Sequence, residues 1–132
     1  MTWQEFRASL AVKFAKMAPD LIHNRSFIMD AQDKIRETVT SNPVVLYMKG
    51  SPQFPMCGFS ASATQMLKAC GVDAPFTVDV LQDADIRQGI KEYANWPTIP
   101  QLYVNGEFVG GADIMREMYQ SGELQQMLGT AK

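Results

Sequence analysis

Apolar side chains recur every three or four residues in some stretches of the chain and form short runs in others. The first spacing predicts helices over 3–17, 30–40, 60–69, 83–93, 113–120 and 122–128. The buried-type run VVLYM at 44–48 and the alternating FTVDV at 76–80 predict strands. QLYV and EFVG flank Asn105-Gly106, a two-residue hairpin signal, and predict two more strands.

From residue 30 onward the predicted order is α-β-α-β-α-β-β-α, with a final short helix. A strand-helix-strand unit followed by a helix and a hairpin favours a small mixed sheet with helices on both faces. We therefore expect an α/β chain with a four-stranded mixed sheet, compatible with a thioredoxin-like fold.

Charge is divided unevenly along the 132 residues. Residues 1–28 hold four basic and two acidic side chains, whereas residues 29–132 hold eight basic and twelve acidic ones. We expect one folded domain over 29–132, long enough to bury an ordinary core, preceded by an extension over 1–28.

The composition excludes several classes of function. The net charge of −2 provides no basic field for nucleic acid, and no apolar run is long enough to span a membrane. Two cysteines cannot form a disulfide framework, and the N-terminus lacks a secretory apolar segment. A reducing compartment is therefore expected.

Cys57 lies in the loop GSPQFPMCGFS, between a predicted strand and a predicted helix. In the first helical turn its sulfur would face unpaired backbone N–H groups, which favour the reactive thiolate. Lys49 at the strand end would add a positive charge, and Gly58 leaves room for a ligand. The alternative, that Cys57 is a small buried apolar residue, fits a Gly/Pro-rich loop poorly.

Ser60 stands three positions after Cys57, where dithiol redox sites carry a second cysteine. A serine cannot resolve a disulfide, so it either supports the helix start or has no special role. Cys70 lies thirteen residues along, about 20 Å away if the helix is continuous, and is expected to be part of the core.

Two later stretches suit a peptide-like ligand. In NWPTIPQL, Pro100 precedes a strand and is a candidate cis proline, which would leave the backbone of Ile99 open; a merely rigid loop is the alternative. In VGGAD, the amides of Ala112 and Asp113 could bind a carboxylate at a helix start, or Asp113 could be only an N-cap. Arg87 is a candidate carboxylate partner or a solvated helix charge.

YMKGSPQFPMCGFS, NWPTIPQLYVNGEFVGGADI and EMYQSGELQQML together resemble the monothiol glutaredoxins of the CGFS class. The similarity covers about residues 30–130, and its motifs occur in the family's order. The single-domain form resembles bacterial and mitochondrial members, whereas residues 1–28 resemble nothing in that family.

The resemblance implies glutathione-dependent [2Fe-2S] binding and transfer. In this family, two protomers each supply one cysteine, here Cys57, and two glutathione molecules supply the other two thiolates. It implies as partners glutathione, a second copy in a cluster-bridged homodimer, BolA-like proteins and apo iron–sulfur proteins. It also implies glutathione contacts here from Lys49, Arg87, Thr98, Ile99, Pro100, Gly111, Ala112 and Asp113.

Two alternatives remain open at this point. One is a monothiol oxidoreductase that removes glutathione from mixed disulfides, and the other is an inert thioredoxin-like interaction module. Glu5, Asp20 and only two arginines in residues 1–28 are unlike a mitochondrial presequence, so a bacterial cytoplasmic location is expected over the mitochondrial matrix.

Overall fold

The computed structural model describes residues 30–131. A four-stranded mixed sheet runs through its centre in the order β2-β1-β3-β4. Strand β1 (Val44–Met48) pairs in parallel with β2 (Phe76–Asp79) and antiparallel with β3 (Gln101–Val104). Strand β4 (Glu107–Gly110) pairs antiparallel with β3. The predicted α/β, thioredoxin-like architecture is confirmed.

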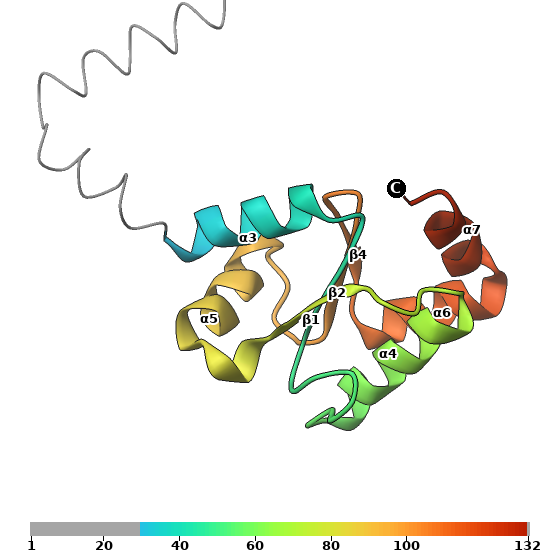
Figure 1. The fold of residues 1–132 in the computed structure, drawn as a ribbon, viewed down its shortest axis with the longest axis horizontal. Coiled ribbons are helices and arrows are strands. Elements are labelled where there is room, and N and C mark those ends of the chain that lie inside the picture. The colour runs from blue at the N-terminus through green and yellow to red at the C-terminus, as the bar shows by residue number, and fades with distance from the viewer. Residues whose placement is uncertain (1–29, 132) are drawn as a thin grey trace, which may run out of the picture. The chain divides into compact units, whose positions relative to one another are not determined.

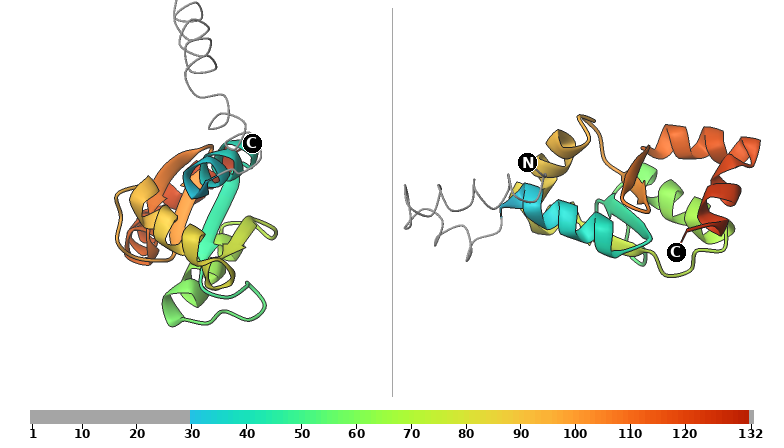
Figure 2. Two further views of the ribbon diagram at one scale, coloured as in Figure 1. Left: turned by 90° about the vertical axis from the view of Figure 1, so that its left-hand side faces the viewer. Right: turned by 90° about the horizontal axis from the view of Figure 1, so that it is seen from above.

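Helices cover both faces of the sheet (Figures 1 and 2). Helices α3 (Ala31–Ser41) and α5 (Ala84–Tyr93) pack together on one face. Helices α4 (Gly58–Ala69), α6 (Ala112–Ser121) and α7 (Glu123–Gly129) cover the other. All three layers are needed to bury both faces of the central strands.

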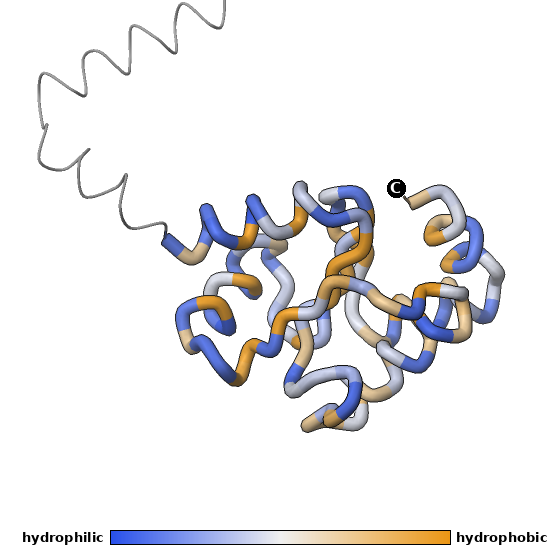
Figure 3. The backbone as a smooth tube through the Cα atoms, viewed as in Figure 1, coloured by the Kyte–Doolittle hydropathy of each residue, from blue (hydrophilic) through white to orange (hydrophobic). Residues whose placement is uncertain are grey.

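The core is divided by the sheet because successive side chains of a strand point to opposite faces. All five residues of β1 are buried. Leu46 and Met48 pack with the α4, α6 and α7 side, whereas Val45 and Tyr47 pack with the α3 and α5 side. Hydrophobic residues, drawn in orange, accordingly gather in the strands at the centre of the domain (Figure 3).

Several boundaries differ by a few residues from the predicted ones. Helix α4 begins at Gly58, two residues early, so Cys57 is its N-cap rather than a residue of its first turn. Helix α6 begins at Ala112 with Gly111 as N-cap, which corrects the interpretation of Asp113 as a cap. The predicted β2 ends at Asp79, whose side chain accepts from the Leu81 N–H and caps a short 3-10 helix.

The hairpin predicted at Asn105-Gly106 is present. Both residues have positive φ, 52° and 84°, as the tight turn between two twisted strands requires. The turn brings β4 back along β3, so Gly110 and Gly111 reach the same end of the sheet as the loop before β3.

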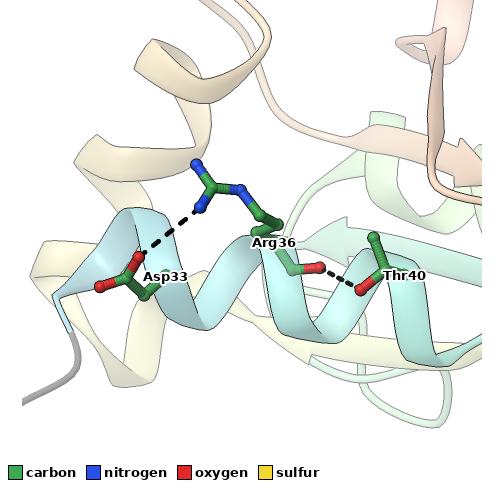
Figure 4. A network of polar contacts seen from close by, with 3 residues as sticks. All are labelled: Asp33, Arg36 and Thr40. Atoms are coloured by element: carbon green, nitrogen blue, oxygen red, sulfur yellow. Dashed lines mark hydrogen bonds and ion pairs between the residues drawn. The ribbon is translucent and has the colours of Figure 1, made fainter. Parts of the chain in front are cut away.

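Figure 4 shows local polar contacts along α3. The Arg36 guanidinium lies 3.8 Å from the Asp33 carboxylate, and the Thr40 hydroxyl donates to the Arg36 carbonyl at 2.7 Å. Between residues 30 and 131, no helix is both long and apolar enough to cross a membrane. The helix predicted over 3–17 and the domain boundary near residue 29 lie outside the described residues and stay predictions.

Candidate functional site

The loop after β1 folds back on itself and returns the chain to the strand end. The Met56 N–H donates to the Lys49 carbonyl at 2.9 Å, and Ser51 and Phe54 exchange two backbone hydrogen bonds. Gly50 has φ +89°, and a side chain there would collide with the Phe54 carbonyl. Only glycine fits this turn, which places Cys57 close to the end of β1.

Asp79 fixes the base of the loop from the neighbouring strand. Because Asp79 pairs with Met48 in the parallel register, its carboxylate accepts from the Gly50 N–H at 2.9 Å and from the Leu81 N–H at 3.0 Å. Partial burial works against ionisation, but these amides and the Gln82 side chain lower the pKa of Asp79 overall. The carboxylate thus remains an acceptor at neutral pH.

Cys57 is a half-buried thiol whose pKa lies below its ordinary value. Burial alone would raise this pKa, but the backbone N–H and hydroxyl of Ser60, the Phe59 N–H and the Lys49 charge together lower it. The sulfur makes no regular capping hydrogen bond, so it remains available to a ligand. These are the conditions that produce a reactive or metal-binding thiolate.

Ser60 has a role that the sequence left open. It is fully buried, and its Oγ accepts from the Lys49 N–H at 3.1 Å while its hydroxyl stabilises the Cys57 thiolate. The second position of the dithiol pattern is therefore occupied by a hydroxyl that joins the strand end to the thiol. A sulfur would be a weak acceptor at this buried position.

Beside the loop lies a cavity of about 360 Å³, a size suited to a small-molecule ligand. All eight residues expected to contact glutathione line it. They are Lys49 after β1, Arg87 on α5, Thr98, Ile99 and Pro100 before β3, and Gly111, Ala112 and Asp113 at the start of α6. Cys57 is not itself among the lining residues, although its neighbour Phe59 is.

The cavity carries more positive charge than Lys49 and Arg87 supply. Lys91 lines it together with Lys49 and Arg87, while Asp113 is the one carboxylate that residues 30–131 contribute to its lining. Lys91 follows Arg87 by four residues, so both lie on one face of α5. From the sequence, this four-residue spacing is the feature that could have placed Lys91 beside Arg87. The combination suits a ligand with carboxylates and one ammonium group.

The turn before β3 forms one wall of the cavity. The Ile99–Pro100 peptide is cis, as the sequence suggested, and Ile99 is 8% exposed. No hydrogen bond within residues 30–131 uses the Ile99 backbone. Gly111 closes the turn against α6, since a Cβ there would lie 3.2 Å from the Pro100 carbonyl and 3.3 Å from the Trp96 indole nitrogen.

Cys70 lies at the other end of α4 and packs against the core cluster, half-buried. Burial raises its pKa, opposite to Cys57, and neither cysteine forms a disulfide. In the part of the chain that the structure describes, no cluster of three histidine, cysteine or acidic side chains could hold a metal ion. One chain thus offers one suitable thiolate.

Comparison with known proteins agrees with this geometry. The glutaredoxin family model matches residues 44–109, which includes the thiol loop and the turn before β3. The chain belongs to the glutaredoxin family. A monothiol glutaredoxin ycf64-like protein of Synechocystis is 59% identical over 103 residues, covering 77% of this chain and 94% of that protein. Glutaredoxin 4 of Escherichia coli K12 is 58% identical over 96 residues, covering 73% and 83%. The resemblance to monothiol glutaredoxins is confirmed.

Solved structures agree as well. Reduced apo GrxS14 of poplar is 52% identical and superposes with a TM-score of 0.63 over 73% of this chain and 87% of that one. A buckwheat glutaredoxin–glutathione complex is 25% identical, with a TM-score of 0.66 over 75% and 87%.

Proposed function

We propose that this glutaredoxin binds glutathione in the cavity and, with a second copy, carries a [2Fe-2S] cluster for transfer to apo iron–sulfur proteins. The observation that carries the proposal is the lone thiol of lowered pKa beside a cation-rich cavity, with a buried hydroxyl where a resolving thiol would stand. A buckwheat relative forms a complex with glutathione, which supports the identity of the ligand.

Glutathione fits the cavity by charge and by shape. Lys49, Arg87 and Lys91 suit its glycyl carboxylate, and the start of α6 with Asp113 suits the γ-glutamyl end, which carries a carboxylate and an ammonium group. The free backbone of Ile99 suits the peptide-like middle of the tripeptide. The cysteinyl thiol would then lie toward Cys57.

The cluster requires more thiolates than one chain provides. A [2Fe-2S] cluster takes four such ligands, and Cys57 supplies one. Two copies and two glutathione molecules complete the set, and a cluster held partly by non-covalent ligands can leave to a recipient. Phe54, Met56 and Phe59 are 78%, 67% and 59% exposed around Cys57, and they offer apolar surface for a second copy or a BolA-like protein.

The test is anaerobic reconstitution of the full chain with iron, sulfide and glutathione, followed by native mass measurement. We expect a coloured dimer that contains one cluster and two glutathione molecules. Cys57→Ser should abolish the colour, whereas Cys70→Ser should retain it, because Cys70 packs against the core at the far end of α4. Equal loss of colour in both variants contradicts the assignment.

A second function is favoured by the lowered pKa of Cys57. The thiolate would attack the glutathionyl sulfur of a mixed disulfide and release the protein thiolate, after which free glutathione would regenerate Cys57 and leave as oxidised glutathione. Fast turnover on a glutathionylated protein without cluster binding would favour this oxidoreductase. We place either activity in the bacterial cytoplasm, where thiols remain reduced.

A further inference from the structure

We propose that Gln101 is a positioning residue for the glutathione cavity, acting through the Trp96–Thr98 turn and through Ile99. Gln101 is not among the residues that line the cavity. It is the first residue of β3, fully buried, immediately after the turn that forms the cavity wall. The inference rests on the proposed binding of glutathione.

The carboxamide of Gln101 ties two points of the turn to the strand. Its Nε2 donates to the Trp96 carbonyl at 3.0 Å and to the Thr98 carbonyl at 3.2 Å. Pro97 and Pro100 have no N–H, so this segment has few donors of its own for those carbonyls. A side-chain amide from the strand supplies both missing donors.

The orientation of that amide is fixed from the other side. The Tyr103 hydroxyl donates to Gln101 Oε1 at 2.9 Å inside the core. Burial, and then the nearby Tyr47 and Tyr93, raise the pKa of Tyr103, so its hydroxyl stays protonated. A flipped amide would turn its oxygen toward two carbonyl oxygens, so only one orientation satisfies all three partners.

Holding these carbonyls determines which groups of the turn a ligand can reach. With the Trp96 and Thr98 carbonyls already paired, Ile99 is left with its backbone groups unpaired at the cavity wall. The turn also lies against Gly111, next to the amides at the start of α6. A shift of the turn would therefore disturb both the peptide-binding and the carboxylate-binding parts of the cavity.

The test measures glutathione affinity by calorimetry on the full chain for wild type, Gln101→Met and Gln101→Glu. Gln101→Met keeps the side-chain length without polar atoms, while Gln101→Glu keeps the acceptor for Tyr103 and removes the amide donors. We expect each to bind glutathione about tenfold more weakly, equivalent to about 1.4 kcal/mol. The second variant provides the measurement if the first does not fold.

A stability control separates positioning from general loosening. Val39→Ala removes buried methyl groups on α3, in the same half of the core as Tyr103 but outside the cavity. It should lower the melting temperature yet leave glutathione affinity within about twofold. In saturated samples, the Ile99 and Asp113 amide resonances should both respond less to glutathione in the Gln101 variants than in the wild type and in Val39→Ala.

The outcomes are distinct. If the wild type binds glutathione and both Gln101 variants bind it with the same affinity, the positioning role is wrong and the proposed function stands. Loss of affinity in Val39→Ala equal to that in the Gln101 variants also overturns it, since stability alone would then explain the result. Failure of the wild-type chain to bind glutathione overturns both proposals.

Discussion

Replacing Ser60 by alanine should change the fold and the thiol together, because one hydroxyl serves both. Its Oγ accepts the Lys49 N–H at 3.1 Å in a fully buried position, and its hydroxyl helps to lower the pKa of Cys57. In Ser60→Ala the backbone N–H loses its acceptor and the thiolate loses a donor. Both losses arise at the point where β1 joins the site.

The size of the stability effect follows from two opposing contributions. A donor left unsatisfied in the interior costs about 1–3 kcal/mol. Alanine is the better helix former by about 0.5 kcal/mol, which offsets part of that cost within α4. The free energy of unfolding should therefore fall by about 0.5–2.5 kcal/mol, and the pKa of Cys57 should rise.

The pH dependence of this difference has a definite sign. A thiol whose pKa is lowered on folding stabilises the folded state only above that lowered pKa, and the stabilisation is complete above the unfolded value. Below the Cys57 pKa, the wild type and Ser60→Ala differ only by the lost Lys49 hydrogen bond and the gain in helix propensity. As the pH rises through the Cys57 pKa, the stability difference between them should widen.

Urea unfolding at several pH values measures the stability, and alkylation rate against pH measures the thiol pKa in a Cys70→Ser background. Ser62→Ala is the matched control, because Ser62 lies half-buried on the same helix and the same gain in helix propensity applies. If Ser60→Ala and Ser62→Ala unfold at the same urea concentration and alkylate alike, the role assigned to Ser60 is wrong.

Four further variants, with Phe76→Ser as a control, test the rest of the site. Lys49→Gln and Arg87→Gln should each weaken glutathione binding about ten- to a hundredfold, as measured by calorimetry. Only Lys49→Gln should also raise the pKa of the Cys57 thiol. If Lys49→Gln changes neither the glutathione affinity nor the thiol pKa, Lys49 is a solvated charge with no role in the site. Phe54→Ser should weaken the cluster-loaded dimer, as measured by sedimentation. Phe76→Ser is the control, because Phe76 is a 47% exposed apolar residue on β2, away from the thiol loop, and it should leave the dimer unchanged. Equal effects of the two variants would exclude the thiol loop as the contact surface. Asp79→Ala should lower the free energy of unfolding by about 1 kcal/mol and speed amide exchange at the loop base, and protection equal to wild type would contradict the anchoring role.

The strands and the hairpin were predictable because their signals are local. The apolar run of β1 and the Asn105-Gly106 turn depend on neighbouring residues alone. The start of α4 could not be predicted from the sequence, since glycine at residue 58 is a poor helix former. Cys57 nevertheless acts as N-cap there because the loop hydrogen bonds and Gly50 bring it to the end of β1.

The residues that line the cavity could be named from the family resemblance, but the residues that hold the cavity and the thiol in place could not. In the sequence, Gln101 is an ordinary polar residue at the start of a predicted strand, and Ser60 is an ordinary polar residue at the start of a predicted helix. Their roles depend on burial and on partners in other elements, which no local pattern encodes. Lys91 lies between these cases, because its four-residue spacing from Arg87 placed it on the same helix face.

The residues that hold the thiol and the cavity in place lie together at one end of the sheet, and the register of β1 against its neighbouring strands explains why. Tyr47 pairs with Gln101 across the antiparallel strands, and Met48 pairs with Asp79 across the parallel ones. Lys49 follows directly and has contacts in both halves of the site, through its N–H to Ser60 and its charge toward Cys57 and the cavity. A slip of β1 by one residue would move Lys49 away from Ser60 and turn every β1 side chain to the opposite face. The burial of all five β1 residues therefore holds the thiol and the ligand cavity in a fixed relation.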